Sequence, residues 1–445
     1  MAKRSVCLIS TLQDRTASVI LQHLRISSFN VSPGARSRAG RRSVCSDSVA
    51  QEVKSLEPKH YSSREVAIIG GSAAGMFTAH LLARRGARVQ VFEGAGQLDP
   101  RPRTLIVTAQ MLETVGPASQ QAITNEIRRF ELFTDGRVAE IALRRPDLVV
   151  ERSKLISCLA NQARAAGAQI LLGRRFLGMQ TNARQLELSV ERKEDGRIEV
   201  VGAQTVVGAD GAVSRVAQAG GWPKQSTVPL LQAIVRLPRG MRVDTTRVWF
   251  IPEDTPYFYW LIPQSPVQGA LGLIGENGVQ TRRVLDRFLE KHHLEPLEFQ
   301  AARIPLYTGW IPVRRKLPSG EIYLVGDAAG HVKVTTVGGI VTGFRGALGV
   351  AEAILNRGTY RRLKALKREL DVHLLIRKAI HNFKQADYSK LVDLINATVR
   401  QDLETCTRDE PAKMLLRLCL HEPRLLLMGL RSLLANRSAL RVRDH

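Results

Sequence analysis

Arg64-Glu-Val-Ala-Ile-Ile-Gly70-Gly-Ser-Ala-Ala-Gly75 begins the stretch that decides the fold of this chain, and Val-Gln-Val-Phe-Glu93 ends it. Val66–Ile69 is a short apolar run leading into glycine, which is typical of a buried parallel strand entering a tight turn. Ala73–Arg85 follows with helix-forming residues and apolar side chains at helical spacing. The apolar run before Glu93 predicts a second strand.

A strand, a glycine-rich loop, a helix and a strand in this order predict a dinucleotide-binding unit. Gly70 permits a sharp turn, a small residue at Ser72 lets a pyrophosphate approach the backbone, and Gly75 lets helix and strand pack closely. The helix N-terminus offers N–H groups to phosphates, and Glu93 can accept hydrogen bonds from a ribose diol. The predicted cofactor-binding residues of this unit are Gly70, Gly71, Ser72, Ala73, Ala74, Gly75 and Glu93. The stretch alone fits NAD as well as FAD, and the alternative is a structural βαβ unit without a ligand.

Composition narrows the classes of partner. The 445 residues carry a formal net charge of +24 but only 5% aromatic residues, and no RNA- or DNA-binding motif appears, so we expect no nucleic-acid partner. An anionic membrane surface and a merely solvated basic face both remain open as explanations of the charge. The five cysteines have no metal-ligand spacing, so no metal site is predicted. No apolar run is long enough to span a bilayer.

A second stretch has the same order of a strand, a glycine-containing turn and a helix. A short apolar strand precedes Gly326-Asp327-Ala-Ala-Gly330, and a helix is predicted to follow Gly338-Gly339-Ile340. A carboxylate between a strand and a helix N-terminus, as at Asp327, can bind a ribityl or ribose hydroxyl. The backbone N–H groups of Gly338, Gly339 and Ile340 can bind the pyrimidine edge of a flavin and favour negative charge there. Arg103 and Arg152 are further candidates for contacts with the cofactor.

These motifs together resemble the FAD-binding fold shared by para-hydroxybenzoate hydroxylase-type monooxygenases and geranylgeranyl reductases. The resemblance rests on Gly70–Gly75, Glu93, Arg152, Gly208-Ala-Asp-Gly211 and Gly326–Gly330, and it covers roughly residues 64–355. It implies that FAD is the cofactor. It also implies that Asp210 lies near the dinucleotide, and that Asp327 binds the ribityl chain or the pyrophosphate.

Two segments resemble the geranylgeranyl reductase branch most. Gly326-Asp-Ala-Ala-Gly330 and the loop after it resemble the reductase motif that ends in Pro-Thr-Thr-Gly-Gly-Gly-Ile, although Val334 replaces the Pro and Val337 a Gly. Phe258-Tyr-Trp-Leu-Ile-Pro263 is similar to the reductase motif Tyr-x-Trp-x-Phe-Pro. Phe258, Trp260 and Ile262 are therefore the predicted substrate-binding residues, with packing in a core sheet as the alternative.

Fewer segments resemble the other flavoenzyme branches, the monooxygenases and the halogenases. Arg103-Thr104-Leu105 looks more like a monooxygenase, which keeps that activity open. Flavin-dependent halogenases need a lysine shortly after the first flavin motif, and no lysine occurs between Lys59 and Lys154. Halogenation is therefore disfavoured.

The predicted fold class is α/β, with a Rossmann-like FAD/NAD(P)-binding domain, a mainly antiparallel substrate sheet and a C-terminal helical region. The predicted organisation is an extension at 1–63, FAD-binding segments at 64–130, 147–222 and 321–355, substrate-sheet strands at 131–146, a substrate domain at 223–320 and helices at 356–445. The hairpins are centred on Asp135-Gly136 and Asp195-Gly196. A helix is expected over Asp147–Ala166, and three helices over Tyr360–Ala386, Lys390–Leu403 and Pro411–Ala435.

The two ends of the chain leave alternatives open. Residues 1–60 are rich in Arg and Ser, and they read as a disordered tail, an organellar targeting segment or a misassigned start. We expect a cytoplasmic protein, with organellar targeting as the alternative. The leucine-rich C-terminal helices either pack over the sheet or lie on a membrane with arginines at the headgroups.

The function expected from these residues is reduction of C=C bonds in a large apolar, isoprenoid-like substrate by hydride from reduced FAD. An FAD-dependent monooxygenase is the second hypothesis, and a non-catalytic flavin- or lipid-binding protein is the third. His331 and Tyr259 are weak candidates for a catalytic acid. No second phosphate-binding motif is visible, so NAD(P)H and a ferredoxin are both open as electron donors.

Overall fold

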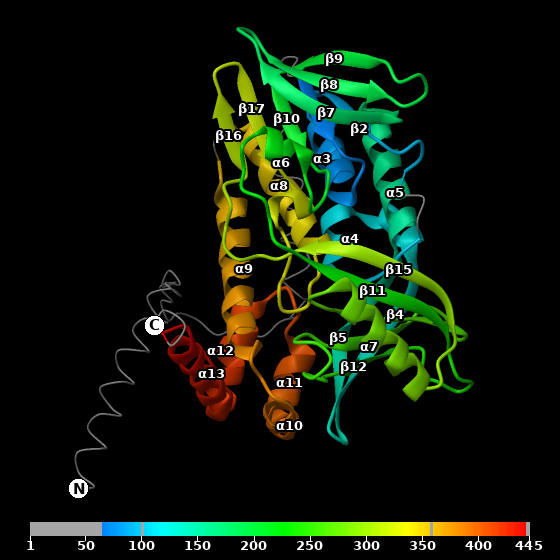
Figure 1. The fold of residues 1–445 in the computed structure, drawn as a ribbon, viewed down its shortest axis with the longest axis vertical. Helices are drawn as coiled ribbons and strands as arrows, with labels where there is room; N and C mark the ends of the chain where they lie inside the picture. Colours follow the sequence, from blue (N-terminus) through cyan, green and yellow to red (C-terminus); the bar gives the residue numbers. More distant parts are fainter. Residues whose placement is uncertain (1–64, 99–101, 357–358, 442–445) are drawn as a thin grey trace, which may run out of the picture. The chain divides into compact units, whose positions relative to one another are not determined.

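Three β-sheets and the helices that connect them make up residues 65–98, 102–356 and 359–441, the part of the chain that the computed structural model describes (Figure 1). The predicted extension at 1–63 lies outside the described residues. The mixed α/β architecture confirms the predicted fold class.

The first sheet is the predicted Rossmann-like sheet, with strand order β16-β17-β10-β1-β2-β6. Its strands are β1 (Glu65–Ile69), β2 (Arg88–Glu93), β6 (Gln169–Leu172), β10 (Thr205–Gly208), β16 (Arg314–Leu317) and β17 (Gly320–Leu324). All neighbours are parallel except β16 and β17. The chain runs from β1 to β2 on one side, while β10 lies on the other side of β1. This reversal places a ligand-binding crevice at the carboxyl ends of β1 and β10.

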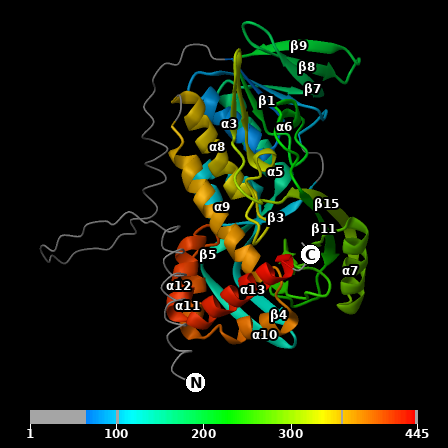
Figure 2. The ribbon, with the colours of Figure 1, turned by 60° about the vertical axis from the view of Figure 1, so that its left-hand side comes forward.

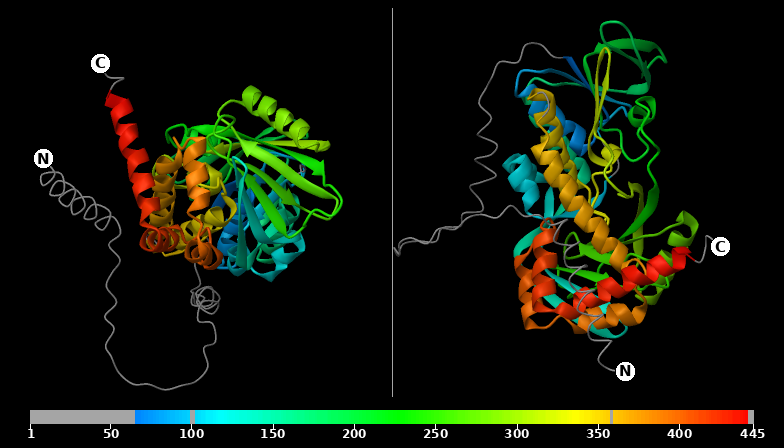
Figure 3. Two further views of the ribbon diagram at one scale, coloured as in Figure 1. Left: turned by 90° about the horizontal axis from the view of Figure 1, so that it is seen from below. Right: turned by 90° about the vertical axis from the view of Figure 1, so that its left-hand side faces the viewer.

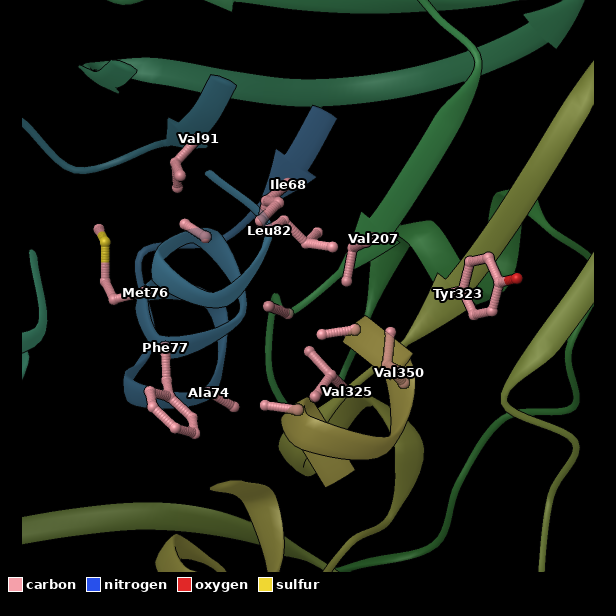
Figure 4. Close-up of a cluster of buried hydrophobic side chains, with 14 of the residues drawn as sticks. Ile68, Ala74, Met76, Phe77, Leu82, Val91, Val207, Tyr323, Val325 and Val350 are labelled. Carbon is pink, nitrogen blue, oxygen red and sulfur yellow. The ribbon is translucent and has the colours of Figure 1, made fainter. Parts of the chain in front are cut away.

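Helices α3 (Ala73–Ala83), α5 (Arg152–Ala165) and α8 (Ile340–Leu355) accompany this sheet, and α3 packs against both of the others. Figure 4 shows how side chains from the strands, such as Ile68, Val91 and Val207, gather with Leu82 of α3 and Val350 of α8. The continuous apolar strands are buried on both faces, as parallel sheets require. The core therefore fixes the positions of the strand ends where the cofactor residues lie.

The second sheet has eight strands in the order β15-β11-β14-β13-β12-β4-β5-β3. They are β3 (Thr104–Val107), β4 (Ile123–Thr134), β5 (Arg137–Glu151), β11 (Thr227–Arg236), β12 (Thr245–Trp249), β13 (Tyr259–Pro263), β14 (Gln268–Ile274) and β15 (Pro296–Pro305). Only the pair of β12 and β4 is parallel. Helix α7 (Gly278–Lys291) packs against β11 and β14. The mainly antiparallel substrate sheet is thus confirmed.

Both predicted hairpin turns are present. Asp135 and Gly136 have φ angles of 43° and 73°, the left-handed conformations that a two-residue hairpin turn needs. The hairpin around Gly196 joins β8 (Leu186–Arg192) to β9 (Ile198–Ala203) in a three-stranded sheet whose third strand is β7 (Arg174–Thr181). Four short elements complete the body of the fold: α4 (Gln110–Val115), η1 (Pro117–Ala122), α6 (Arg215–Ala219) and η2 (Gly326–Ala329).

The expected helix over Asp147–Ala166 begins later than predicted. Strand β5 continues to Glu151, and α5 starts at Arg152. Val149 and Val150 pair with β3 and β4 and are fully buried, so partner strands override the helical spacing of these residues. The eight-stranded sheet consequently takes strands from 104–107 and 123–151, beyond the predicted 131–146.

The C-terminal region is helical as predicted, but it has five helices in the described residues where three were expected (Figure 2). They are α9 (Arg361–Ile380), α10 (Gln385–Asp393), α11 (Ala397–Thr405), α12 (Pro411–His421) and α13 (Pro423–Arg441). Pro423 starts a new helix, because proline is accepted in a first helical turn and not in a helix interior. Among the described helices, none combines the length and apolarity needed to cross a bilayer.

Candidate cofactor site

The glycine loop has the geometry that its sequence predicts. Gly70 has a φ angle of 107°, and a Cβ atom there would lie 2.5 Å from the carbonyl oxygen of Ala209. A Cβ atom on Gly75 would lie 2.4 Å from the carbonyl oxygen of Gly70. Gly70 therefore makes the turn and Gly75 makes the close contact between helix and strand, as expected.

Ser72 occupies the place of the middle glycine without closing the loop. It is the N-cap residue of α3, and its Oγ accepts the backbone N–H of Gly75 at 3.2 Å. The hydroxyl is thus turned onto the helix. Gly71 donates its backbone N–H to Glu93 Oε2 at 2.6 Å, and the other oxygen of Glu93 accepts the N–H of Ala95 at 2.8 Å. These bonds hold the carboxylate at the end of β2, where a ribose is expected.

A cleft of about 440 Å³ opens at the carboxyl ends of β1 and β10. Six predicted residues line it: Gly70, Gly71, Ser72, Glu93, Arg152 and Asp210. Arg174, Arg175 and Arg215 also line it, and sequence reasoning missed them because their approach depends on the fold of β7 and α6. The cleft combines backbone donors and cations, which is what a pyrophosphate binds.

Asp210 lies in this cleft and organises its far wall. Its carboxylate accepts the hydroxyl of Ser214 at 2.5 Å and the backbone N–H groups of Arg215 and Val216 at 2.7 and 3.1 Å. Burial raises the pKa of Asp210, although these hydrogen bonds oppose the shift. Asp210 lines the cleft together with the glycine loop, its side chain holds the start of α6, and its contact with a dinucleotide stays a prediction.

The second half of the site is built around Asp327. Burial raises the pKa of this partly buried carboxyl group, while attraction to Arg103 and Arg152 opposes the shift. A Cβ atom on Gly339 would lie 3.1 Å from Asp327 Oδ1, so the carboxylate lies beside the start of α8. Because Arg152 also lines the cleft at the glycine loop, it connects the two halves. Gly326 likewise lies against Ala74 of α3.

Glu151 positions both arginines and was missed as a site residue. It is the N-cap of α5, and its carboxylate accepts the backbone N–H groups of Arg103, Ser153 and Lys154 at 3.2, 3.0 and 2.7 Å. Burial alone would raise the pKa of Glu151, but these hydrogen bonds and one from the Ser153 hydroxyl lower it below its usual value. The backbone N–H of Arg152 donates to the carbonyl of Arg103 at 3.0 Å. Glutamate is an uncommon N-cap residue, so no local pattern in the sequence indicated this role.

The start of α8 offers the predicted flavin contacts. Gly339 is the N-cap residue and Ile340 the first helical residue, and none of the described side chains caps this N-terminus. Gly338 closes the preceding loop through a bridge to Lys333. The N–H groups of this turn and the positive end of the helix therefore suit the edge of a flavin where negative charge develops.

The C-terminal region contacts this loop at Val334, one of the two positions that depart from the reductase pattern. Val334 packs with Leu366 and Leu370 of α9. Lys333 forms an ion pair with Asp409, a residue between α11 and α12, and the two side chains are 7% and 0% exposed. The loop is thus held by residues that lie beyond the FAD-binding segments.

Val337 adopts a conformation that a β-branched residue rarely takes. Its φ angle is 52°, in the left-handed region, where such residues carry a strain of about 1–3 kcal/mol. Its side chain is 8% exposed and packs in a cluster with Trp260 and Ile262. The loop therefore keeps the backbone shape expected of glycine and adds an apolar contact.

The predicted substrate-binding residues pack in the core on one face of the large sheet, which is the alternative given for them above, so their contact with a substrate stays a prediction. Trp260, Ile262, Val332 and Val337 belong to one apolar cluster, and Phe258 packs against it. The indole Nε1 of Trp260 is buried without a hydrogen-bond partner among the described residues. Residues of the sheet and residues of the flavin loop thus pack in one buried apolar cluster.

The two weak candidates for a catalytic acid do not fit that role. Tyr259 faces the other cluster, beneath α7, where its hydroxyl donates to Asp254 at 2.9 Å. His331 is fully buried and stacks on Trp310, and burial lowers the pKa of His331 to about 3, so at neutral pH it is not in the imidazolium form that could act as an acid. Tyr257, which sequence reasoning passed over, lies in the cluster of Trp260, and burial raises the pKa of its hydroxyl.

The residues fit FAD at both ends. The glycine loop, Glu93 and the basic cleft suit the ADP half, while Asp327 and the α8 N-terminus suit the ribityl chain and the flavin. Within the described residues, no group of three His, Cys, Asp or Glu side chains is placed to hold a metal ion.

Comparisons with known proteins agree with this site. A model of the FAD binding domain matches residues 63–359. Digeranylgeranylglycerophospholipid reductase 2 of Methanopyrus kandleri is 28% identical over 300 residues, which cover 62% of this chain and 73% of that protein.

Solved structures share the fold. A geranylgeranyl bacteriochlorophyll reductase-like protein from Thermoplasma acidophilum has a TM-score of 0.68 and 18% identity, covering 83% of this chain and 100% of that one. A flavin-dependent monooxygenase in complex with FAD and substrate has a TM-score of 0.55 and 15% identity, covering 85% and 72%. The chain belongs to the family with this FAD binding domain, within the superfamily of geranylgeranyl reductases and para-hydroxybenzoate hydroxylase-type monooxygenases, and it is an FAD-dependent oxidoreductase.

Proposed function

We propose that this protein reduces C=C bonds in the isoprenoid chains of a lipid. The observation that carries the proposal is the single apolar cluster shared by the sheet and the flavin loop, in which Trp260 and Ile262 meet Val332 and Val337. An isoprenoid chain offers only apolar surface, so an apolar cluster of this kind can orient the chain and exclude water. The digeranylgeranylglycerophospholipid reductases among the relatives support this substrate class.

FAD, when bound and reduced, supplies a hydride to one alkene carbon, and a proton goes to the other carbon. The chain contributes orientation and charge. The N-terminus of α8, which has no side-chain cap, would favour the negative charge that a bound reduced flavin carries at its pyrimidine edge before it gives up the hydride. Arg103 and Arg152 hold Asp327 and the pyrophosphate end. Tyr257 lies in the same apolar cluster as Trp260, and we assign its hydroxyl, which is protonated at neutral pH as in any tyrosine, as the source of the proton.

Hydroxylation of an apolar or aromatic substrate is the second candidate. The segment Arg103-Thr104-Leu105 resembles monooxygenases, and the monooxygenase neighbours share the fold. Fold alone does not choose between the two reactions, because both use the same reduced flavin. The distinction is therefore an experimental one.

Anaerobic reoxidation separates the candidates. We expect the dithionite-reduced enzyme to regain oxidised flavin absorbance when a geranylgeranyl phospholipid is added without oxygen, with one H2 gained per reduced double bond by mass spectrometry. Trp260→Ala should slow this reaction, whereas Trp249→Ala should not, because Trp249 packs with Phe288 of α7 on the opposite cluster. Reoxidation that requires dioxygen and yields a hydroxylated product would establish the monooxygenase. Failure to take up added FAD would favour a non-catalytic lipid-binding protein.

The electron donor belongs to the same proposal. A ferredoxin would find cations on the exposed face of α9, at Arg361, Lys364 and Arg368. NAD(P)H is the alternative donor. Reduction rates measured with each donor at low and high salt distinguish them, because docking of an acidic protein weakens with salt.

A further inference from the structure

Many apolar side chains of helices α12 and α13 are not buried by the rest of the protein. Twelve leucine and methionine positions occur between Met414 and Leu434, and none of these side chains is buried. Among them Leu416, Leu420 and Leu427 are 47%, 68% and 56% exposed. Exposed apolar side chains gathered in this way mark an interaction surface.

The inner side of these helices is already occupied. Helices α12 and α13 pack against each other and against α9, and Gly429 of α13 faces Ala379 of α9. Figure 3 shows α13 at the outer edge of the C-terminal helices. Arg424, Leu427 and Arg431 follow one another at spacings of three and four residues, so they share the outward face of α13. This face, together with Leu416 and Leu420 of α12, is called the outer leucine face.

Charge indicates what the outer leucine face binds. Residues 411–434 contain four cations, at 413, 417, 424 and 431, and one acid, Glu422, whose side chain is 6% exposed. The Arg424 side chain is 69% exposed and that of Arg417 is 42% exposed. Leucines that alternate with arginines fit a surface with acyl chains below and anionic headgroups above.

We propose that the outer leucine face docks on an anionic phospholipid bilayer. Leu420 and Leu427 enter the boundary between headgroups and acyl chains, while Arg417, Arg424 and Arg431 contact phosphates. The inference rests on this surface alone and holds whichever reaction the flavin site performs. A bilayer is also where an isoprenoid lipid would be met.

Vesicle sedimentation tests the proposal with the full-length, FAD-loaded protein. The vesicles contain saturated phosphatidylcholine and phosphatidylglycerol, so they offer no reducible double bond. We expect binding to fall at least about tenfold in the double variant Leu420→Asp/Leu427→Asp. Arg431→Gln should lower binding about fivefold, with less effect at high salt. Val279→Asp is the matched control, because Val279 is 72% exposed on α7 and should leave binding unchanged.

Three outcomes would overturn the proposal. The first is equal binding of the parent and the double variant to these vesicles, at equal FAD content. The second is a parent that is dimeric by analytical ultracentrifugation and becomes monomeric in the double variant without any vesicle binding, because a second copy then covers the face. The third is a parent that binds no vesicles while the double variant loses thermal stability, because the chain itself then covers the face.

Discussion

The ion pair between Lys333 and Asp409 is expected to link the flavin loop to the C-terminal region energetically. Its side chains are almost fully buried, and the Thr108 hydroxyl also donates to Asp409. Burial opposes ionisation of Asp409, but attraction to Lys333 and the hydrogen bonds outweigh it and lower its pKa. Removing one partner leaves the other charge buried, so Lys333→Met or Asp409→Leu should each cost about 3–5 kcal/mol. The double variant should lie within about 1 kcal/mol of the parent, because it buries neither charge.

Urea unfolding of the four proteins at pH 7.5 gives the coupling energy, and flavin fluorescence gives their FAD affinity. We expect each single variant to weaken FAD binding as well, because Lys333 bridges to Gly338 at the base of the loop. The control is the exposed pair Arg282 and Asp286 on α7, whose side chains are 49% and 42% exposed and whose coupling should stay below about 0.5 kcal/mol. Additive effects of Lys333→Met and Asp409→Leu, with no coupling beyond that of the control, would refute the reasoning.

Three further predictions concern the site itself. Gly75→Ala should lose FAD and about 1–3 kcal/mol of stability, because the added Cβ would lie 2.4 Å from the carbonyl oxygen of Gly70. Gly278→Ala is the control, because a Cβ there has no atom within 4 Å, and this variant should be stable and retain FAD. The flavin content of each variant after gel filtration distinguishes the two outcomes. Arg152→Met should raise the FAD dissociation constant about 10- to 100-fold by titration calorimetry, and the same change at the exposed Arg164 should not. His331 has a pKa of about 3 when folded and the ordinary value of 6.5 when unfolded. Its contribution to the free energy of unfolding is therefore complete above pH 6.5 and is lost as the pH falls towards 3. Below pH 6, the free energy of unfolding of His331→Leu should therefore rise relative to that of the parent by about 1.4 kcal/mol for each pH unit of acidification, as measured by urea unfolding. Plots of unfolding free energy against pH that stay parallel for the two proteins would contradict this.

The cofactor half of the site was largely predictable, because its signals are local. A strand, a turn that requires glycine and a helix start follow one another between Glu65 and Gly75, so each residue's role depends on its near neighbours. The same holds for the hairpin at Asp135-Gly136, whose turn type is set by two adjacent residues. The role of Ser72 as the N-cap residue of α3, which keeps its hydroxyl on the helix, was not predicted and came from the structure.

The local sequence pattern was insufficient to predict secondary structure where strand pairing overrides helical spacing. Val149 and Val150 have partners on both β3 and β4, and that pairing draws residues 147–151 into a strand. Tyr259 and Trp260 are adjacent in sequence, but their side chains lie on opposite faces of the sheet and therefore belong to different apolar clusters. The choice of Tyr259 as a candidate acid failed for this reason.

The sequence by itself determined a dinucleotide-binding loop, because the turn and the helix start between Gly70 and Gly75 depend on short-range backbone requirements. The order of Glu93, Asp210 and Asp327 along the chain then carried the resemblance that implies FAD. Only the tertiary structure decided what surrounds the flavin loop. Lys333 meets Asp409 across 76 positions, and Val334 meets α9, because the C-terminal helices fold back onto the FAD-binding segments. Such contacts depend on burial and charge compensation between distant segments, and no local pattern in either segment specifies its partner.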